Sequence, residues 1–234
     1  AMQAFSLLMK INQVENYRAC ATSAMRESTN GQQVADEVYK RTGVRIEIID
    51  GAEEASIIAS TDISSLIQKD KDYLYIDVGG GSTEFTVFSK GKVKKSRSFP
   101  IGTVRLLDNK VSDKTWEDVE KWIKKHTKDC EHIEAIGSGG NINKIHKNSN
   151  SKEGEPLSYQ YLTDYHNYVS GFSYEERIRL LGFNPDRADV ILYALTVFTN
   201  AMKWSGAEIV HVPRIGLADG IVRTIYNKEN NVIK

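Results

Sequence analysis

The residues best suited to chemistry lie where an apolar run ends in an acid and then in glycines. Ile76-Asp77-Val78 is followed by Gly79, Gly80, Gly81, Ser82, Thr83 and Glu84 before an alternating run resumes. This order predicts a strand, a glycine turn and a second strand, with Asp77 at the end of the first. Glycines allow positive φ and close approach, so successive N–H groups can converge on an anion. A hairpin turn alone needs fewer glycines, so we predict a phosphate loop beside a carboxylate that can hold a divalent cation.

A second glycine turn follows the apolar run at residues 132–136. It consists of Gly137, Ser138 and Gly139, and a helix is predicted over residues 142–147. Junctions of strand, glycine and helix bind phosphate at the helix N-terminus. Such a turn is common on its own, but together with the first loop it supports a phosphate site.

Two further candidates stand just after predicted strands. Arg26 follows the strand at 17–22, and Glu53 and Glu54 open a helix after the strand at 44–49. Side chains at the carboxyl ends of strands line the ligand crevices of open α/β sheets. Two acids in a first helical turn also complement the helix dipole, and Arg26 also fits a surface helix. The local sequence leaves both readings open.

The elements that must position these residues alternate between strands and helices, which predicts an α/β protein. A charged connector at residues 68–72 suggests two domains, 1–70 and 71–234, with the last helix packing back on the first domain. We also predict a helix at 31–42 with Val34 and Val38 inward, and one long helix over 186–204. Thr115 is predicted to cap a helix, and Ser173 with Glu176 to form a capping box.

Composition excludes several classes of function. Lys and Arg balance Asp and Glu at 31 each, so no global field would recruit nucleic acid. No apolar run approaches the roughly 20 residues of a membrane span. Two distant cysteines suggest reduced thiols in a cytoplasmic protein, and the scattered histidines give no zinc spacing. The basic run Lys92, Lys94, Lys95 and Arg97 is interpreted as a solvated strand face, with a polyphosphate track as the alternative.

Five stretches in order resemble the exopolyphosphatase / guanosine pentaphosphate phosphohydrolase (Ppx/GppA) family. They are residues 21–27, 48–55, 76–84, 137–140 and 216–220, and the resemblance covers nearly the whole chain. The family belongs to the actin, sugar-kinase and heat-shock ATPase superfamily. The resemblance implies two ribonuclease-H-like domains facing a cleft, with the active site between them.

The resemblance also implies roles and ligands. Glu54 would be the general base, with Glu53 a neighbour of lesser role, and Arg26 would neutralise phosphoryl oxygens. Asp77 would be catalytic, holding Mg²⁺ or Mn²⁺ or orienting the water, and Glu84 would assist at the metal. The phosphate would be held by Gly79, Gly80, Gly81, Ser82 and Thr83, and by Gly137, Ser138 and Gly139 on the far side. The substrate would be inorganic polyphosphate or a guanosine polyphosphate, and we expect a homodimer that binds neither nucleic acid nor membrane.

Departures from the family pattern leave alternatives open. Family members open with a strand hairpin carrying Asp-x-Gly-Ser-Asn/Thr, and nothing in residues 1–20 matches it. We therefore expect the first domain to lack its opening strands and half of the phosphate cradle. Ala218 stands where the family often has Arg. The alternatives are a non-catalytic binder of polyphosphate or an alarmone, and an ATP-dependent kinase of the same superfamily.

Overall fold

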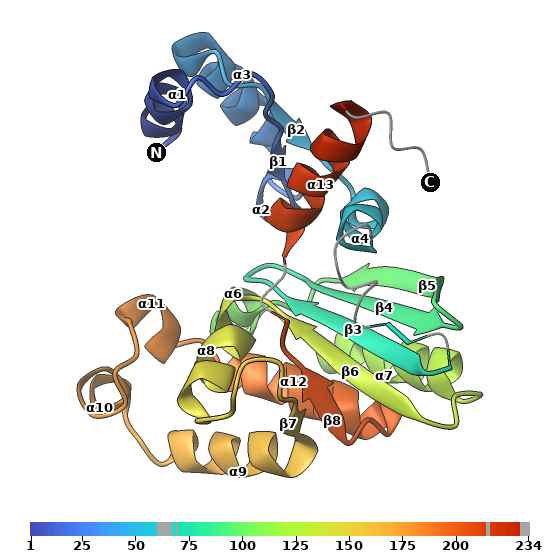
Figure 1. The fold of residues 1–234 in the computed structure, drawn as a ribbon. Helices are drawn as coiled ribbons and strands as arrows, with labels where there is room; N and C mark the ends of the chain where they lie inside the picture. Colours follow the sequence, from blue (N-terminus) through green and yellow to red (C-terminus); the bar gives the residue numbers. More distant parts are fainter. Residues whose placement is uncertain (60–66, 69, 214–215, 230–234) are drawn as a thin grey trace. The chain divides into compact units, whose positions relative to one another are not determined.

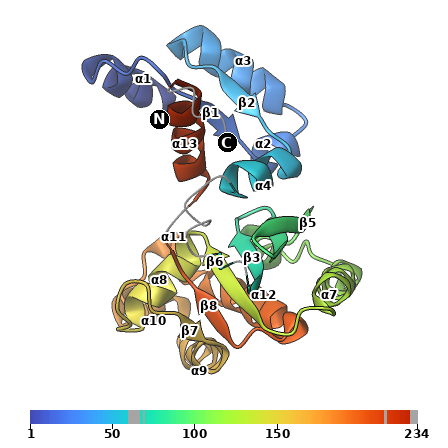
Figure 2. The ribbon, with the colours of Figure 1, turned by 45° about the vertical axis from the view of Figure 1, so that its right-hand side comes forward.

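The computed structural model describes residues 1–59, 67–68, 70–213 and 216–229. The chain divides into two compact units, one of residues 1–61 with 217–234 and one of residues 62–216. Both units combine helices with strands, and the predicted α/β class is confirmed (Figures 1 and 2). Within the described ranges, no helix combines the length and the apolar character that crossing a membrane requires.

The first unit is built on two short parallel strands. β1 (Ala19–Ala21) pairs with β2 (Ile46–Ile48). Its helices are α1 (Met2–Ile11), α2 (Ser23–Arg26), α3 (Gly31–Thr42), α4 (Gly51–Ala59) and α13 (Leu217–Glu229). Helix α13 packs against α4 with Gly220 at the contact, where a methyl group would lie 2.4 Å from the carbonyl oxygen of Ile57. Helices α2 and α4 each begin directly after a strand, which brings their first turns to the same end of the strand pair.

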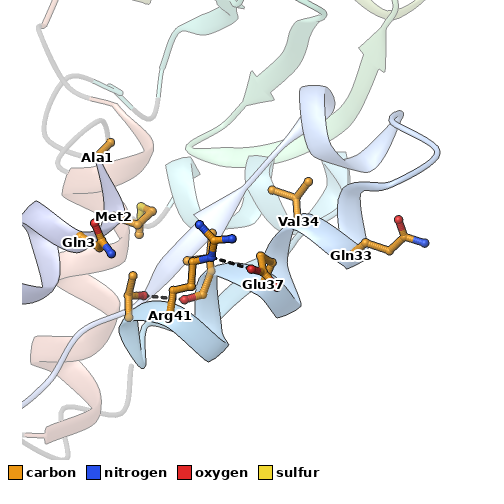
Figure 3. A pocket seen from close by; sticks show the side chains of 9 residues that line it. Ala1, Met2, Gln3, Gln33, Val34, Glu37 and Arg41 are labelled. Carbon is orange, nitrogen blue, oxygen red and sulfur yellow. Dashed lines mark hydrogen bonds and ion pairs between the residues drawn. The ribbon is translucent and has the colours of Figure 1, made fainter.

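The inward face of α3 differs from the prediction. Ala35 is buried, whereas Val34 is 42% exposed and Val38 is only partly buried. The face of α3 that packs therefore contains Ala35 and lies about one residue away from the predicted face with Val34 and Val38. Val34 instead borders a hollow of about 630 Å³ between α1 and α3, beside the ion pair of Arg41 and Glu37 (Figure 3). None of the predicted site residues lines this hollow.

The second unit is a sheet covered by helices. In the described residues the strand order is β5-β4-β3-β6-β8-β7. The strands are β3 (Asp72–Val78), β4 (Thr83–Ser89), β5 (Lys92–Phe99), β6 (Ile133–Ser138), β7 (Leu157–Ser158) and β8 (Ile209–His211). The helices are α6 (Thr103–Leu107), α7 (Asp113–Thr127), α8 (Gly140–Asn148), α9 (Tyr159–Ser170), α10 (Tyr174–Arg179), α11 (Pro185–Ala188) and α12 (Ile191–Ser205). β3, β4 and β5 form antiparallel hairpins, and β6 runs parallel to β3.

The two faces of β3 carry different residues, because one face packs in the core and the other carries Asp77. Leu74, Ile76 and Val78 of β3 belong to the apolar core, which also includes residues of α7, α8 and α12. Because successive side chains point to opposite faces of a sheet, Tyr75 and Asp77 share the other face. Asp77 thus projects from the face that does not pack on these helices.

The structure confirms one of three predictions about where helices begin and end, and differs from the other two. The capping box of Ser173 and Glu176 at the start of α10 is confirmed. Thr115 does not cap α7, because the hydroxyl of Ser112 accepts the bond from the Thr115 amide. The long helix at 186–204 is two helices, α11 and α12. The amide of Val190 bonds the carbonyl of Arg187 at 3.1 Å, an i−3 turn that interrupts the α-helical pattern.

Candidate active site

The glycine loop after β3 is held from one side by the segment that opens α6. The amide of Thr103 donates to the carbonyl of Gly79 at 3.0 Å, and that of Val104 to Gly80 at 2.9 Å. The Nε of Arg105 donates to the carbonyl of Gly81 at 2.7 Å. Three successive carbonyl groups of the loop are therefore turned toward residues 103–105.

Peptide planarity fixes what the other side of the loop presents. In a trans peptide, the C=O of one residue and the N–H of the next point in opposite directions. The three tied carbonyls therefore direct the N–H groups of Gly80, Gly81 and Ser82 away from α6. Within the described part of the chain, these three amides have no backbone or side-chain acceptor. Such an array of adjacent free amides is suited to binding an anion.

The positive φ predicted for the glycines of this loop is not found, and their close approach to a ligand stays a prediction. Gly79, Gly80 and Gly81 do not have φ in the left-handed region. The steric requirement lies at Gly102, which the sequence did not indicate. A methyl group there would lie 2.2 Å from the carbonyl oxygen of Gly80 and 2.5 Å from the carbonyl carbon of Gly81. Only glycine allows residues 102–105 to approach the loop this closely.

Asp77, Glu84 and Ser138 form a row across three neighbouring strands. Asp77 pairs in register with Glu84 of β4 on one side and with Ser138 of β6 on the other. The hydroxyl of Tyr75 lies 3.4 Å from Asp77 Oδ2, and Ser138 also hydrogen-bonds the Asp77 carboxylate. The acids Asp77 and Glu84 lie directly opposite each other on neighbouring strands. Like charges in this position destabilise a sheet when no cation lies between them.

The environment of Asp77 alters its acidity. The pKa of Asp77 is raised from its ordinary 3.8 to about 6, chiefly because the carboxyl is buried and secondly because the charge of Glu84 lies nearby. The hydrogen bonds from Tyr75 and Ser138 act oppositely. Glu84 is only 4% exposed, and its Oε1 accepts bonds from Ser82 at 2.6 Å and Ser98 at 2.7 Å. Both carboxylates are thus oriented by nearby hydroxyl groups, of which Ser138 and Ser98 belong to the adjoining strands.

The pair of acids suits magnesium better than a metal held entirely by protein. Among the described residues, no group of three or more His, Cys, Asp or Glu side chains gathers to hold a metal ion. Mg²⁺ is commonly bound by one or two carboxylates, with water and substrate phosphate completing its shell. Asp77 and Glu84 fit this pattern.

The second glycine turn contacts the first site. Gly139 has φ of 109°, and a methyl group there would lie 2.9 Å from the carbonyl oxygen of Val78 and 3.5 Å from Asp77 Oδ1. Gly137 lies within β6, where a methyl group would meet Ile142 and Phe198 at 3.1 Å. Gly139 therefore allows α8 to begin beside Asp77, while the surroundings of Gly137 indicate a packing role. Its predicted role in phosphate binding stays a prediction.

A basic pocket that the sequence did not indicate lies beside Gly140, the residue after Gly139. It has a volume of about 440 Å³ and is lined by Gly140, Asn143, Lys144, Lys147, Asn184 and Arg187. Arg187 of α11 donates to the carbonyl of Gly140, which attaches α11 to the first turn of α8. Two lysines and an arginine with a helix N-terminus suit an anion. Arg187 lies 47 residues from Gly140 in the chain, so no local pattern could reveal the pocket.

The candidates of the first unit come together around the start of α4. Arg26 Nη1 donates to the carbonyl of Ile49 at 2.8 Å and lies 3.8 Å from Glu54 Oε2. Glu54 is buried at 7% exposure, whereas Glu53 is exposed and pairs with Arg18. The two adjacent glutamates therefore differ sharply. Glu54 faces inward beside a cation, and Glu53 belongs to a surface ion-pair network.

Comparison with known proteins identifies the family. A profile described as the Ppx/GppA phosphatase family matches residues 1–229. The chain belongs to this family. An exopolyphosphatase from Cytophaga hutchinsonii has the same fold, with a TM-score of 0.83 at 22% identity, over 97% of this chain and 80% of that one.

Relatives of this chain differ in the activities that their names state and in their lengths. A bifunctional 3-dehydroquinate synthase/phosphatase of Fusobacterium nucleatum is 28% identical over 92% of this chain and 35% of its own length. A guanosine-5'-triphosphate,3'-diphosphate pyrophosphatase of Aeromonas hydrophila is 30% identical over 48% of this chain and 22% of its own length. The chain thus spans about a third or less of the length of these relatives.

Proposed function

We propose that this protein is a phosphoanhydride hydrolase that releases the terminal phosphate of inorganic polyphosphate or of guanosine pentaphosphate. The observation that carries the proposal is the loop whose three carbonyls are tied to residues 103–105, because it directs three adjacent amides away from α6, an arrangement suited to binding an anion. Family membership supports the reaction class, and the names of the relatives support both substrates. A homodimer and a cytoplasmic location remain predictions from the sequence.

Each residue is assigned a role that its surroundings support. The amides of Gly80, Gly81 and Ser82 bind oxygens of the terminal phosphate, and Asp77 and Glu84 hold Mg²⁺. When bound there, the ion would neutralise charge on the phosphoryl oxygens. Phosphoryl transfer depends mainly on such positioning and charge neutralisation. The α8–α11 pocket, with Lys144 and Arg187, binds further phosphate groups of the substrate.

Glu54 is the proposed general base. It removes a proton from the water whose oxygen attacks the terminal phosphorus. The bond between that phosphorus and the bridging oxygen breaks, and the shortened chain leaves as an oxyanion. Arg26 supports this role because a buried carboxylate needs a nearby cation to remain charged at low cost.

The test compares two adjacent glutamates. Glu54→Gln should lower phosphate release from polyphosphate in the presence of Mg²⁺ by at least about 100-fold, the scale of general base catalysis. Glu53→Gln is the matched control and should keep most of the activity. Equal activity of Glu54→Gln and wild type would remove Glu54 from the mechanism. Binding of polyphosphate without turnover by wild type would favour the non-catalytic binder, and transfer to an acceptor hydroxyl but not to water would favour a kinase.

A further inference from the structure

A row of four side chains crosses the sheet at the candidate active site, and a serine stands at each end of it. Ser98 of β5 pairs in register with Glu84 of β4, Glu84 with Asp77 of β3, and Asp77 with Ser138 of β6. Residues directly paired across a sheet lie on the same face. Each acid therefore has the other acid on one side and a serine on the other. The proposed reaction gives roles to the two acids and none to Ser98.

Two hydroxyl groups donate to the same oxygen of Glu84. Oε1 accepts from the hydroxyl of Ser98 at 2.7 Å and from that of Ser82 at 2.6 Å. Such short distances are expected when a hydroxyl donates to an ionised acceptor. An ionised carboxylate has about four lone-pair sites, divided between its two oxygens. The two serines therefore occupy Oε1, and Oε2 is the oxygen left to coordinate a cation.

The surroundings of Glu84 keep this arrangement in place. Glu84 is 4% exposed and Ser82 is 5% exposed, so bulk water does not compete for Oε1. The carbonyl of Ser82 accepts from the amide of Gly79 at 3.0 Å, which fixes Ser82 within the glycine loop. Ser82 thus connects the loop to the acid. In the proposed function its amide binds phosphate, while its hydroxyl orients Glu84.

The number of oxygens that an acid can offer affects the choice between magnesium and calcium. Ca²⁺ takes about six to eight oxygen ligands in a flexible geometry and accepts both oxygens of one carboxylate. Mg²⁺ is smaller, requires a nearly ideal octahedron and usually keeps several waters beside one or two carboxylates. A glutamate whose Oε1 is occupied by two hydroxyl groups fits the second description and not the first.

We propose that Ser98 and Ser82 are positioning residues that restrict Glu84 to one coordinating oxygen and thereby bias the site toward Mg²⁺ and against Ca²⁺. This inference rests on the proposed function, because it assumes that Asp77 and Glu84 hold the ion. Both hydroxyl groups act through Glu84. Removing either one gives Glu84 a second coordinating oxygen, which favours the larger ion.

The test uses the metal ions alone as probes. Wild type and Ser98→Ala are titrated with MgCl₂ and with CaCl₂ at constant ionic strength, without substrate, and the dissociation constants are obtained from the rise in melting temperature. Ser98→Ala should shift the ratio of the two constants about tenfold toward Ca²⁺, the scale of one hydrogen bond to a charged group. Ser82→Ala, which keeps the loop amide, should shift the ratio in the same direction.

Ser96→Ala is the matched control. Ser96 precedes Ser98 on the same face of β5, and its hydroxyl lies 2.8 Å from that of Thr86 instead of an acid. Both serines are half-buried. The control should keep the wild-type ratio, and so should Ser98→Thr, which retains a hydroxyl group. A merely structural role of Ser98 would lower the melting temperature without changing the ratio.

The outcomes separate this inference from the proposed function. If Mg²⁺ stabilises wild type but not Asp77→Asn, and Ser98→Ala keeps the wild-type ratio, the selection by serine is overturned while the metal site stands. An equal change of ratio in Ser96→Ala would also overturn it. If neither ion raises the melting temperature of wild type, the proposed metal site fails and this inference fails with it. A ratio shifted toward Ca²⁺ in a protein that releases no phosphate would support the inference although the hydrolase proposal fails.

Discussion

Gly102 lies so close to Gly80 that a methyl group on it would come within 2.2 Å of the Gly80 carbonyl oxygen. Through this contact, a residue outside the glycine loop determines the shape of the loop. The amides of Thr103 and Val104 and the guanidinium of Arg105 then fix the three carbonyls. The loop and residues 102–105 act as one structural unit.

Gly102→Ala should therefore displace the loop. Overpacking a well-fitted contact typically destabilises a protein by about 1–3 kcal/mol, and backbone atoms cannot move aside as a side chain can. We expect a lower melting temperature and a loss of phosphate release of at least 100-fold, about the effect of removing oriented amide donors. Gly171→Ala is the control, because its φ of −73° suits alanine and its nearest neighbour would be 3.4 Å away. Equal behaviour of the two variants would contradict the bracing role of Gly102.

Arg105→Lys should impair the loop while leaving the fold intact. Lysine keeps the charge but lacks the planar Nε–H that donates to the carbonyl of Gly81. One loop amide, that of Ser82, would then be less firmly oriented. We expect the KM for tripolyphosphate to rise about tenfold, equivalent to one charge-assisted hydrogen bond, with an unchanged melting temperature. Arg179→Lys, at an exposed position, is the control. A normal KM for Arg105→Lys would show that this bond is dispensable.

Asp77→Asn should stabilise the metal-free protein at pH 8. The folded pKa of Asp77, about 6, lies above its ordinary 3.8, so the folded state binds this proton more tightly than the unfolded state. Ionised Asp77 thus destabilises the fold above pH 6, and this penalty disappears as the pH falls toward 4. We expect urea unfolding in chelator to show a gain of about 3 kcal/mol at pH 8 and almost none at pH 4. Asp118→Asn, at an exposed position of α7, should show no such pH-dependent gain.

Bound Mg²⁺ should make ionised Asp77 stabilise the fold that it destabilises in the metal-free protein. If Asp77 and Glu84 hold the ion, it should raise the melting temperature of wild type. At 100 times the dissociation constant, the stabilisation would be about 2.7 kcal/mol. Asp77→Asn and Glu84→Gln should lose most of this shift, and chelator should abolish phosphate release until Mg²⁺ or Mn²⁺ is added back. Glu131→Gln, an exposed acid, should respond as wild type does. A normal shift in both site variants would place the metal elsewhere.

Sequence patterns predicted the part of the candidate site whose residues lie close together in the chain. The apolar run ending in Asp77, the glycines and the acid at 84 indicated a hairpin, and register then places Asp77 opposite Glu84. They could not locate Gly102, Arg105 or Arg187, because these residues act through contacts with distant parts of the chain. The break between α11 and α12 was missed because apolar periodicity continues across it. Val34 was assigned inward because apolar spacing on α3 does not show which face the rest of the unit covers.

A loop that binds through main-chain amides recognises the tetrahedral end of a phosphate chain and is insensitive to what lies behind it. Under the proposed function, inorganic polyphosphate and a guanosine polyphosphate would present the same terminal group to Gly80, Gly81 and Ser82. Discrimination between them must then come from side chains away from the loop, where Lys144 and Arg187 border a pocket. Substrate preference in this protein can therefore change without altering the residues that hold the reacting phosphate.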